Sequence, residues 1–220
     1  MRMVINNKIA RGYGRPTALI VGRQAEGSAP TLDRRLPVDL MRAKKLMEQA
    51  GYAIGFEVVI DCPNITPSNE YCQALASVLA PIGVKLKLSV VAFANVFQTF
   101  RKFDTSAYVN SYGTPTMNAY FPLEALLRSV GEIGSVGFGR GKYNLGRYSN
   151  TALDMLLDRI KVEMDLSQRN ALIAEALAIA RDDLSVILFL QQIGAWALRK
   201  NINAPAASDA RPHFYRFRDK

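Results

Sequence analysis

The sequence predicts a mixed α/β fold, and three patterns in the middle of the chain indicate it. Residues 84–91 alternate apolar with polar side chains, as in a strand that has one solvated face. Residues 56–61 form a second strand-like run with β-branched side chains, and residues 68–82 between the two place apolar residues at helical spacing. Strand, helix and strand over 56–91 make a βαβ unit, so we expect parallel strands with a right-handed crossover.

A loop and a helix are expected before this unit. Residues 11–36 are rich in Gly, Pro and Arg and predict an extended loop. Asp39 can cap the helix that follows, and Gly51 is a suitable stop. The expected apolar face of this helix consists of Ala43, Leu46, Met47 and Ala50. Within the βαβ unit, Ser68 can start the helix and Gly83 ends it.

Shorter elements and then two long helices are expected after residue 91. They comprise a helix near 95–102, a strand near 105–110, a loop at 111–121, helices near 150–163 and 167–182, and a buried strand at 184–190. Asn150 can cap the first long helix, because its side-chain oxygen can accept a free backbone N–H. The apolar face of that helix consists of Leu153, Leu156, Leu157 and Ile160.

The composition excludes several classes of protein. The 28 Lys and Arg against 19 Asp and Glu give a net charge of +9, but the basic residues are scattered, so we do not expect nucleic-acid binding. No stretch approaches the roughly 18 apolar residues of a membrane-spanning helix, so no membrane insertion is expected. The first eight residues lack the apolar region and cleavage site of a signal peptide.

The sequence offers no catalytic residue, metal site or cofactor site, so we do not expect an enzyme. His213 is the one histidine and lies in a polar tail, and no G-x-S-x-G motif occurs. Asp154 and Asp158 share one helix face, which we expect to be solvated. Cys62 and Cys72 define no metal site. We expect two small buried thiols, with a disulfide as the open alternative.

One string carries a specific resemblance. Residues 142–150 read K-Y-N-L-G-R-Y-S-N, and a helical run follows at once. This is similar to the G-R-Y-S-N-P-x-x-D-x-L-I-D run in the distal lobe of family 5 extracellular solute-binding proteins, with Thr151 in place of the usual proline. Other segments resemble family motifs in the family's order, from about residue 11 to 203. They are residues 12–17, 38–52, 73–84, 163–169, 187–191 and 196–201.

The resemblance implies one lobe of a type II periplasmic-binding-protein-like fold, a mixed sheet flanked by helices. It divides the chain into an N-terminal extended segment (1–36), an α/β distal lobe (37–183), and a hinge strand with a tail (184–220) that runs toward an N-terminal lobe missing from this chain. We expect Trp196, beside the hinge strand, to lie in a core. An apolar strand without its neighbouring lobe is expected to reduce stability or cause self-association.

The implied function is that of the substrate-binding component of an ABC importer. Such a receptor captures an oligopeptide or peptide-like solute in a cleft between two lobes and delivers it to permease subunits. The resemblance implies a periplasmic location, or a cytoplasmic one if these residues are the complete product. The alternative is a truncated protein outside transport that acts as a basic interaction module, whose binding would collapse with salt.

The ligand-binding candidates follow from the same resemblance. In the family, an aromatic residue after the distal-lobe strand faces the cleft, and Tyr112 matches it. Peptide binders carry an aspartate three positions later, where this chain has Pro115, so Asn118 is the neutral polar candidate. The candidates are Tyr112, Gly113, Thr114, Asn118, Tyr120, Tyr143, Asn144 and Arg147. The alternatives are that the tyrosines at 112 and 120 pack under a loop, and that residues 143–147 brace the following helix.

Overall fold

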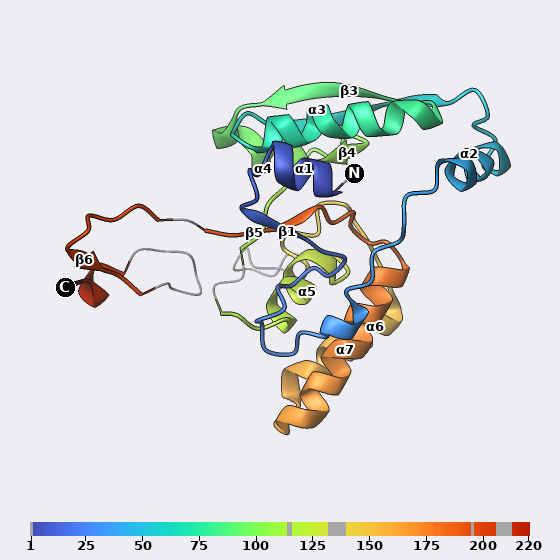
Figure 1. Cartoon of the computed structure of the whole chain (residues 1–220). Coiled ribbons are helices and arrows are strands. Elements are labelled where there is room, and N and C mark those ends of the chain that lie inside the picture. Colours follow the sequence, from blue (N-terminus) through green and yellow to red (C-terminus); the bar gives the residue numbers. More distant parts are fainter. Residues whose placement is uncertain (1, 114–115, 132–139, 195, 206–212) are drawn as a thin grey trace. The chain divides into compact units, whose positions relative to one another are not determined.

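The computed structural model describes residues 2–113, 116–131, 140–194, 196–205 and 213–220 (Figure 1). The chain forms two compact units. Unit 1 consists of Met1–Gly12 and Arg35–Ser111, and unit 2 consists of Tyr13–Arg34 and Tyr112–Lys220. These units reflect packing within this chain, whereas the division expected at residues 36 and 183 concerns the lobes of a receptor. That division stays a prediction.

Unit 1 is built on a parallel sheet of three strands. Its strands are β2 (Phe56–Pro63), β3 (Val84–Val91) and β4 (Ala107–Tyr108), in the order β3-β2-β4. β2 pairs with β3 in parallel from Phe56↔Val84 to Pro63↔Val91, which confirms the predicted parallel pair of the βαβ unit. Helix α3 (Ser68–Leu79) contacts both of these strands (Figure 1).

The remaining elements of unit 1 are short. They are α1 (Arg2–Lys8), α2 (Leu40–Gln49), η2 (Ala80–Ile82), η3 (Phe93–Asn95) and α4 (Val96–Phe100). Asp39 caps α2 as predicted, since its Oδ1 accepts the N–H of Arg42 at 2.8 Å. The apolar face expected for α2 forms but is not covered. None of its side chains is buried, and Leu46 is 55% exposed, because the helix lies beside η2 and not across the sheet.

A disulfide joins the end of β2 to the start of α3. Cys62 and Cys72 have Cα atoms 6.3 Å apart, within the range that a disulfide spans, and both are buried. The expectation of two free thiols is therefore wrong, and the open alternative is correct. The sequence could not decide this, because the separation of the two residues depends on how α3 packs on β2.

Three helices build the core of unit 2. They are α5 (Tyr120–Leu127), α6 (Thr151–Val162) and α7 (Leu166–Asp182), and each contacts the other two (Figure 1). Asn150 caps α6 as predicted, because its Oδ1 accepts the N–H of Leu153 at 3.0 Å. The predicted α6 face is buried at all four positions, and it packs against the α5 and α7 residues Leu123, Leu127, Ile173 and Leu177.

Two small antiparallel pairs complete unit 2. β1 (Gly14–Pro16) pairs with β5 (Leu190–Gln192), and β6 (Ile202–Asn203) pairs with β7 (Arg218–Asp219). The short helices are η1 (Pro30–Leu32) and η4 (Phe214–Arg216). Among the residues that the structure describes, no helix is long and apolar enough to cross a membrane.

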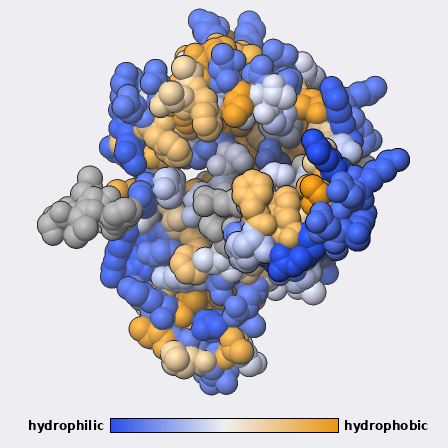
Figure 2. Space-filling view, turned by 90° about the vertical axis from the view of Figure 1, so that its left-hand side faces the viewer, coloured by the Kyte–Doolittle hydropathy of each residue, from blue (hydrophilic) through white to orange (hydrophobic). Residues whose placement is uncertain are grey.

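Two expectations for the end of the chain are wrong. The predicted buried strand at 184–190 is exposed at Leu184 and Ile187, and pairing begins only at Leu190. Trp196 is 55% exposed and lies in no core. The reason is that β5 finds one partner strand, β1, within the described chain, so large parts of the apolar residues around it stay exposed. Figure 2 shows apolar side chains at the surface of one face.

Candidate functional site

Two of the candidate tyrosines face one another. Tyr112 and Tyr143 have ring centroids 5.8 Å apart and planes inclined by 59°, a geometry that aromatic pairs favour. Tyr112 remains 37% exposed, so the pair is accessible. Lys142 Nζ lies 5.3 Å from the centroid of the Tyr143 ring, within cation–π distance. Burial raises the pKa of Tyr112, and the nearby Tyr143 adds to the rise. The pair is a half-exposed aromatic surface with positive charge beside it.

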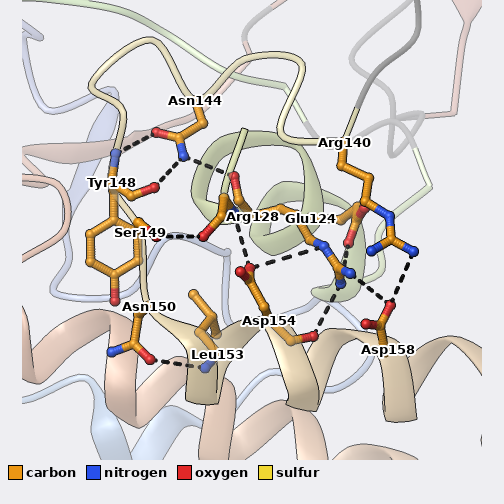
Figure 3. Close-up of polar contacts among 11 residues, drawn as sticks. Glu124, Arg128, Arg140, Asn144, Tyr148, Ser149, Asn150, Leu153, Asp154 and Asp158 are labelled. Carbon is orange, nitrogen blue, oxygen red and sulfur yellow. Dashed lines mark hydrogen bonds and ion pairs between the residues drawn. The ribbon is translucent and has the colours of Figure 1, made fainter. Parts of the chain in front are cut away.

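Asn144 holds the segment that presents Tyr143. Its side chain is buried, and its Nδ2 donates to the backbone carbonyls of Arg128 at 2.8 Å and Tyr148 at 2.7 Å (Figure 3). Its Oδ1 accepts the N–H of Tyr148 at 3.0 Å. Both amide hydrogens are therefore used inside the protein. This geometry favours the alternative in which Asn144 braces the loop before α6 without touching a ligand.

Gly141 lets this loop approach α5 closely. Its φ of +64° lies in the left-handed region, and a Cβ at this position would collide with the carbonyl oxygen of Arg128. The N–H of Tyr143 donates to the Ala125 carbonyl at 2.8 Å, which fixes the loop to α5 a second time. The backbone from which the Tyr143 ring extends is thus held against α5.

Arg128 is a central residue of this region that the sequence analysis missed. Its side chain is 3% exposed and lies among three carboxylates. Its Nη2 donates to Asp158 Oδ1 at 2.7 Å, its Nη1 to the Asp154 carbonyl at 3.1 Å, and Nη1 lies 3.5 Å from Glu124 Oε2 (Figure 3). The expectation that Asp154 and Asp158 form a solvated face holds for Asp158, which is 52% exposed, but not for Asp154, which is 24% exposed. Arg128 reaches both from the end of α5. The spacing of Glu124 and Arg128, one helical turn, was the available signal.

Electrostatics keep the Arg128 guanidinium charged. Burial alone would lower the pKa of Arg128, but the hydrogen bond to Asp158 and the charges of Glu124, Asp158 and Asp154 raise it. The ion pairs of Arg128 link α5 to α6. Arg128 therefore supports the loop that carries Tyr143, because its own carbonyl accepts the bond from Asn144.

Asn118 and Tyr120 lie together at the start of α5. Asn118 Oδ1 accepts the N–H of Tyr120 at 2.9 Å, and the Asn118 side chain also bonds Glu26. Bonds from Arg169 and then from Asn118 lower the pKa of Glu26. Tyr120 packs against the core of unit 2, and burial raises its pKa to about 12, with the charge of Glu124 adding to the rise. Both side chains have a structural role here, in line with the packing alternative for Tyr120.

The structure brings some of the eight candidates together and separates others. Tyr112 and Tyr143 form a pair, while Arg147, exposed and with φ of +52°, shares a turn with Asn144 through its N–H. Gly113 is exposed, and Thr114, with Pro115, lies outside the described residues. No group of three or more metal-ligating side chains occurs in the described part of the chain.

Known proteins match this chain at the level of family and fold. The family model "Bacterial extracellular solute-binding proteins, family 5 Middle" matches residues 2–132. Similar structures include HbpA2 from Haemophilus parasuis, with 19% identity, a TM-score of 0.81, and coverage of 100% of this chain and 43% of that one. None of the curated proteins matches the chain.

Two further similar structures are complexes with a ligand. NikA from Staphylococcus aureus, in complex with Ni(L-His)2, has 14% identity and a TM-score of 0.79, and the alignment covers 100% of this chain and 46% of that one. A dipeptide-binding protein from a Pseudoalteromonas species, in complex with Met-Leu, has 16% identity and a TM-score of 0.77, with coverage of 100% and 43%. The chain thus spans less than half the length of these structures, and it has the α/β architecture of periplasmic binding proteins. With more than half of its residues matched by the family model, the chain belongs to the bacterial extracellular solute-binding proteins of family 5.

Proposed function

We propose that the chain is part of the substrate-binding component of an ABC importer that captures an oligopeptide or peptide-like solute and delivers it to a permease. Membership of the family supports a binding role, and the Met-Leu complex of the Pseudoalteromonas protein supports a peptide as the ligand. A binding protein needs no catalytic residue, so we propose that the chain binds its solute without transforming it.

The Tyr112–Tyr143 pair is the observation that carries this proposal. A ligand site needs a mostly apolar surface with a few polar groups, and the pair provides one at a loop where the family is expected to meet its solute. Lys142 adds positive charge, and the chain has Pro115 where an acid would capture an amine. These features support a ligand that offers an apolar side chain and a carboxylate to this surface.

The proposed mechanism is closure of two lobes about a hinge, as in periplasmic binding proteins. Because residues 1–220 span less than half of the similar structures, we expect these residues alone to provide one side of the cleft. One side without the other cannot enclose the ligand, so the expected affinity is weak, in the millimolar range.

We propose a periplasmic location for the receptor. The family consists of extracellular proteins, and a buried disulfide is typical of proteins that fold in an oxidising compartment. Both observations support export.

The proposal can be tested by NMR titration of the whole chain with Met-Leu and with a tetrapeptide at millimolar concentration. We expect shifts that centre on the Tyr112 and Tyr143 rings, and loss of these shifts in Tyr112→Ala and in Tyr143→Ala. Tyr215→Ala is the matched control, because Tyr215 is 75% exposed and lies outside the pair.

Two results would contradict the proposal. One is saturable peptide binding that Tyr112→Ala and Tyr143→Ala leave unchanged, which would place the ligand elsewhere. The other is no peptide binding together with tight binding of a polyanion that disappears at high salt, which would favour the basic interaction module.

A further inference from the structure

Two side chains from the loop before α6 meet one carboxylate at the end of α7. The Tyr148 hydroxyl donates to Asp183 Oδ2 at 2.5 Å, and Asn150 Nδ2 donates to the same oxygen at 2.8 Å. Asp183 is the C-cap residue of α7. Tyr148 and Asn150 belong to the Y-S-N part of the string on which the family resemblance rests, and the proposed binding surface uses neither of them.

Other bonds position both donors. Asn150 Oδ1 accepts the N–H of Leu153 as the cap of α6, so its Nδ2 is left for Asp183 (Figure 3). Asn144 bonds both the N–H and the carbonyl of Tyr148, which fixes the backbone from which the Tyr148 ring extends. The loop that carries both donors is therefore held in place by bonds other than those to Asp183.

The charges suit this arrangement. A short O–H···O⁻ bond from a phenol to a carboxylate is among the stronger hydrogen bonds in proteins. The bond from Tyr148, and then that from Asn150, lower the pKa of Asp183, while burial and the bond to Asp183 raise the pKa of Tyr148. The neighbouring Asp182 pairs with Arg181 at 2.7 Å. Asp183 thus stays ionised and oriented toward the loop.

The chain changes direction immediately after this contact. Leu184 has a φ of +50°, which is uncommon for a residue with a large side chain. Its N–H donates to the Arg181 carbonyl at 3.2 Å, and both the N–H and the hydroxyl of Ser185 bond the Ala180 carbonyl. From this turn the chain runs to β5, which pairs with β1.

We propose that Tyr148, Asn150 and Asp183 form a latch that fixes the direction in which the chain leaves α7, and that they are positioning residues for residues 184–192. This role in closure rests on the proposed function. In a receptor that closes about a hinge, the latch keeps the end of α7 rigid. Bending is then confined to the residues after Leu184.

Hydrogen–deuterium exchange of the whole chain, read by mass spectrometry, tests the latch. Tyr148→Phe removes only the hydroxyl, and Asp183→Asn removes the charge while keeping the shape. In each variant we expect exchange over 184–192 to rise about three- to tenfold, the range that the loss of one such hydrogen bond allows. Exchange over 166–182 should stay within about twofold of the unmodified chain. Asp182→Asn is the matched control, since it removes a neighbouring charge outside the latch.

Two outcomes would overturn the inference. In one, both variants leave exchange over 184–192 at the level of Asp182→Asn, which would show that the turn holds without the latch. In the other, exchange rises evenly over α5, α6 and α7, which would show a general contribution to stability and no control of direction. The experiment uses no ligand, so its result is independent of whether the chain binds a peptide.

Discussion

Arg128 is the residue on which the loop that carries Tyr143 depends. Its guanidinium is enclosed by carboxylates of α5 and α6, and its carbonyl holds Asn144. Arg128→Met removes the buried charge and leaves Asp154 and Asp158 without it. We expect a loss of about 2–3 kcal/mol in unfolding free energy, at or below the lower limit of about 3 kcal/mol for a broken buried pair, because Asp158 is 52% exposed.

The matched control for this substitution is Arg140→Met. Arg140 Nη2 lies 3.7 Å from the same Asp158 oxygen, but its side chain is 61% exposed. An exposed pair of this kind should contribute less than about 0.5 kcal/mol. Urea unfolding measures both values, and an equal effect of the two substitutions would show that burial of Arg128 has no special role.

Asp33 should make unit 2 sensitive to acid. Burial alone would raise the pKa of Asp33, but the Ala18 N–H at 2.7 Å, Arg23 and Thr17 together lower it below its ordinary 3.8. The stability that this carboxylate contributes is therefore fully present above the ordinary value and is lost as the pH falls through the lower folded value. We expect the melting temperature to decline in that acid range, and Asp33→Asn to flatten this part of the profile. An identical profile in both proteins would contradict the assignment.

At the scale of single residues, the sequence predicted a residue's role within its own helix better than its contacts with distant side chains. Asn150 as a cap could be recognised because the signal is local: a polar side chain, then an apolar helix face. The ion pairs of Arg128 with Asp154 and Asp158 could not, because these partners are about 30 residues away and meet Arg128 only when α5 packs on α6. Likewise, Tyr112 and Tyr143 were separate candidates whose contact depends on the fold.

A disulfide links two elements of unit 1 covalently. It joins β2 to α3 across a sequence separation of 10, and both sulfurs are buried. Replacing Cys62 and Cys72 together with alanine should lower the unfolding free energy by about 2–4 kcal/mol, because the unfolded chain loses a constraint. Chemical unfolding under non-reducing conditions measures this loss.

Reduction provides the control for the disulfide. A reductant should bring the unmodified chain close to the double variant and should leave the double variant unchanged. If the double variant unfolded at the same denaturant concentration as the oxidised chain, the link between β2 and α3 would add nothing to stability.

At the scale of elements, the sequence predicted α2, α3, α6, α7 and the parallel pair, but it missed α1 and α5 and failed at β5. Helix α6 could be predicted from its own residues, because its cap and its apolar face both lie within or next to the helix. The run 184–190 is apolar enough for a buried strand, but burial of a strand depends on neighbours, and β5 pairs with β1 alone in the described chain. Helix α2 forms with its predicted cap, but none of its side chains is buried, so the apolar pattern alone did not determine burial.

The whole molecule exposes an apolar segment after α7, which we define as the described residues from 184 to 198. Its exposed apolar side chains are Leu184, Val186, Ile187, Ile193, Trp196 and Leu198 (Figure 2 shows exposed apolar side chains on one face). Exposed apolar surface next to a short strand favours association. We therefore expect the chain to self-associate in a concentration-dependent way, with Ile187→Lys reducing the association.

Sedimentation velocity measures this behaviour. Leu36→Lys is the control, because Leu36 is also highly exposed but lies in unit 1, far from this segment in the sequence. A monodisperse monomer that melts cooperatively at every concentration would contradict the prediction, and so would equal effects of the two lysine substitutions.

At the scale of the whole molecule, the family could be recognised from sequence, but the solute could not. The family resemblance rests on motifs that occur in the family's order over most of the chain. Each motif can be recognised from sequence because it belongs to a local turn or helix. The solute depends on a few side chains in a cleft, and fold similarity at 14–19% identity extends to proteins with ligands as different as Met-Leu and Ni(L-His)2. In the proposed binding role, the Tyr112–Tyr143 pair favours ligands with an apolar part.

The most direct test is to isolate the protein that carries these residues from the periplasmic and cytoplasmic fractions of its native cell, and to determine its intact mass and its bound small molecules by mass spectrometry. The account predicts a periplasmic species, oxidised at Cys62 and Cys72, that releases a peptide or peptide-like molecule on denaturation. A species confined to the cytoplasm, with reduced cysteines and no bound solute, would contradict it.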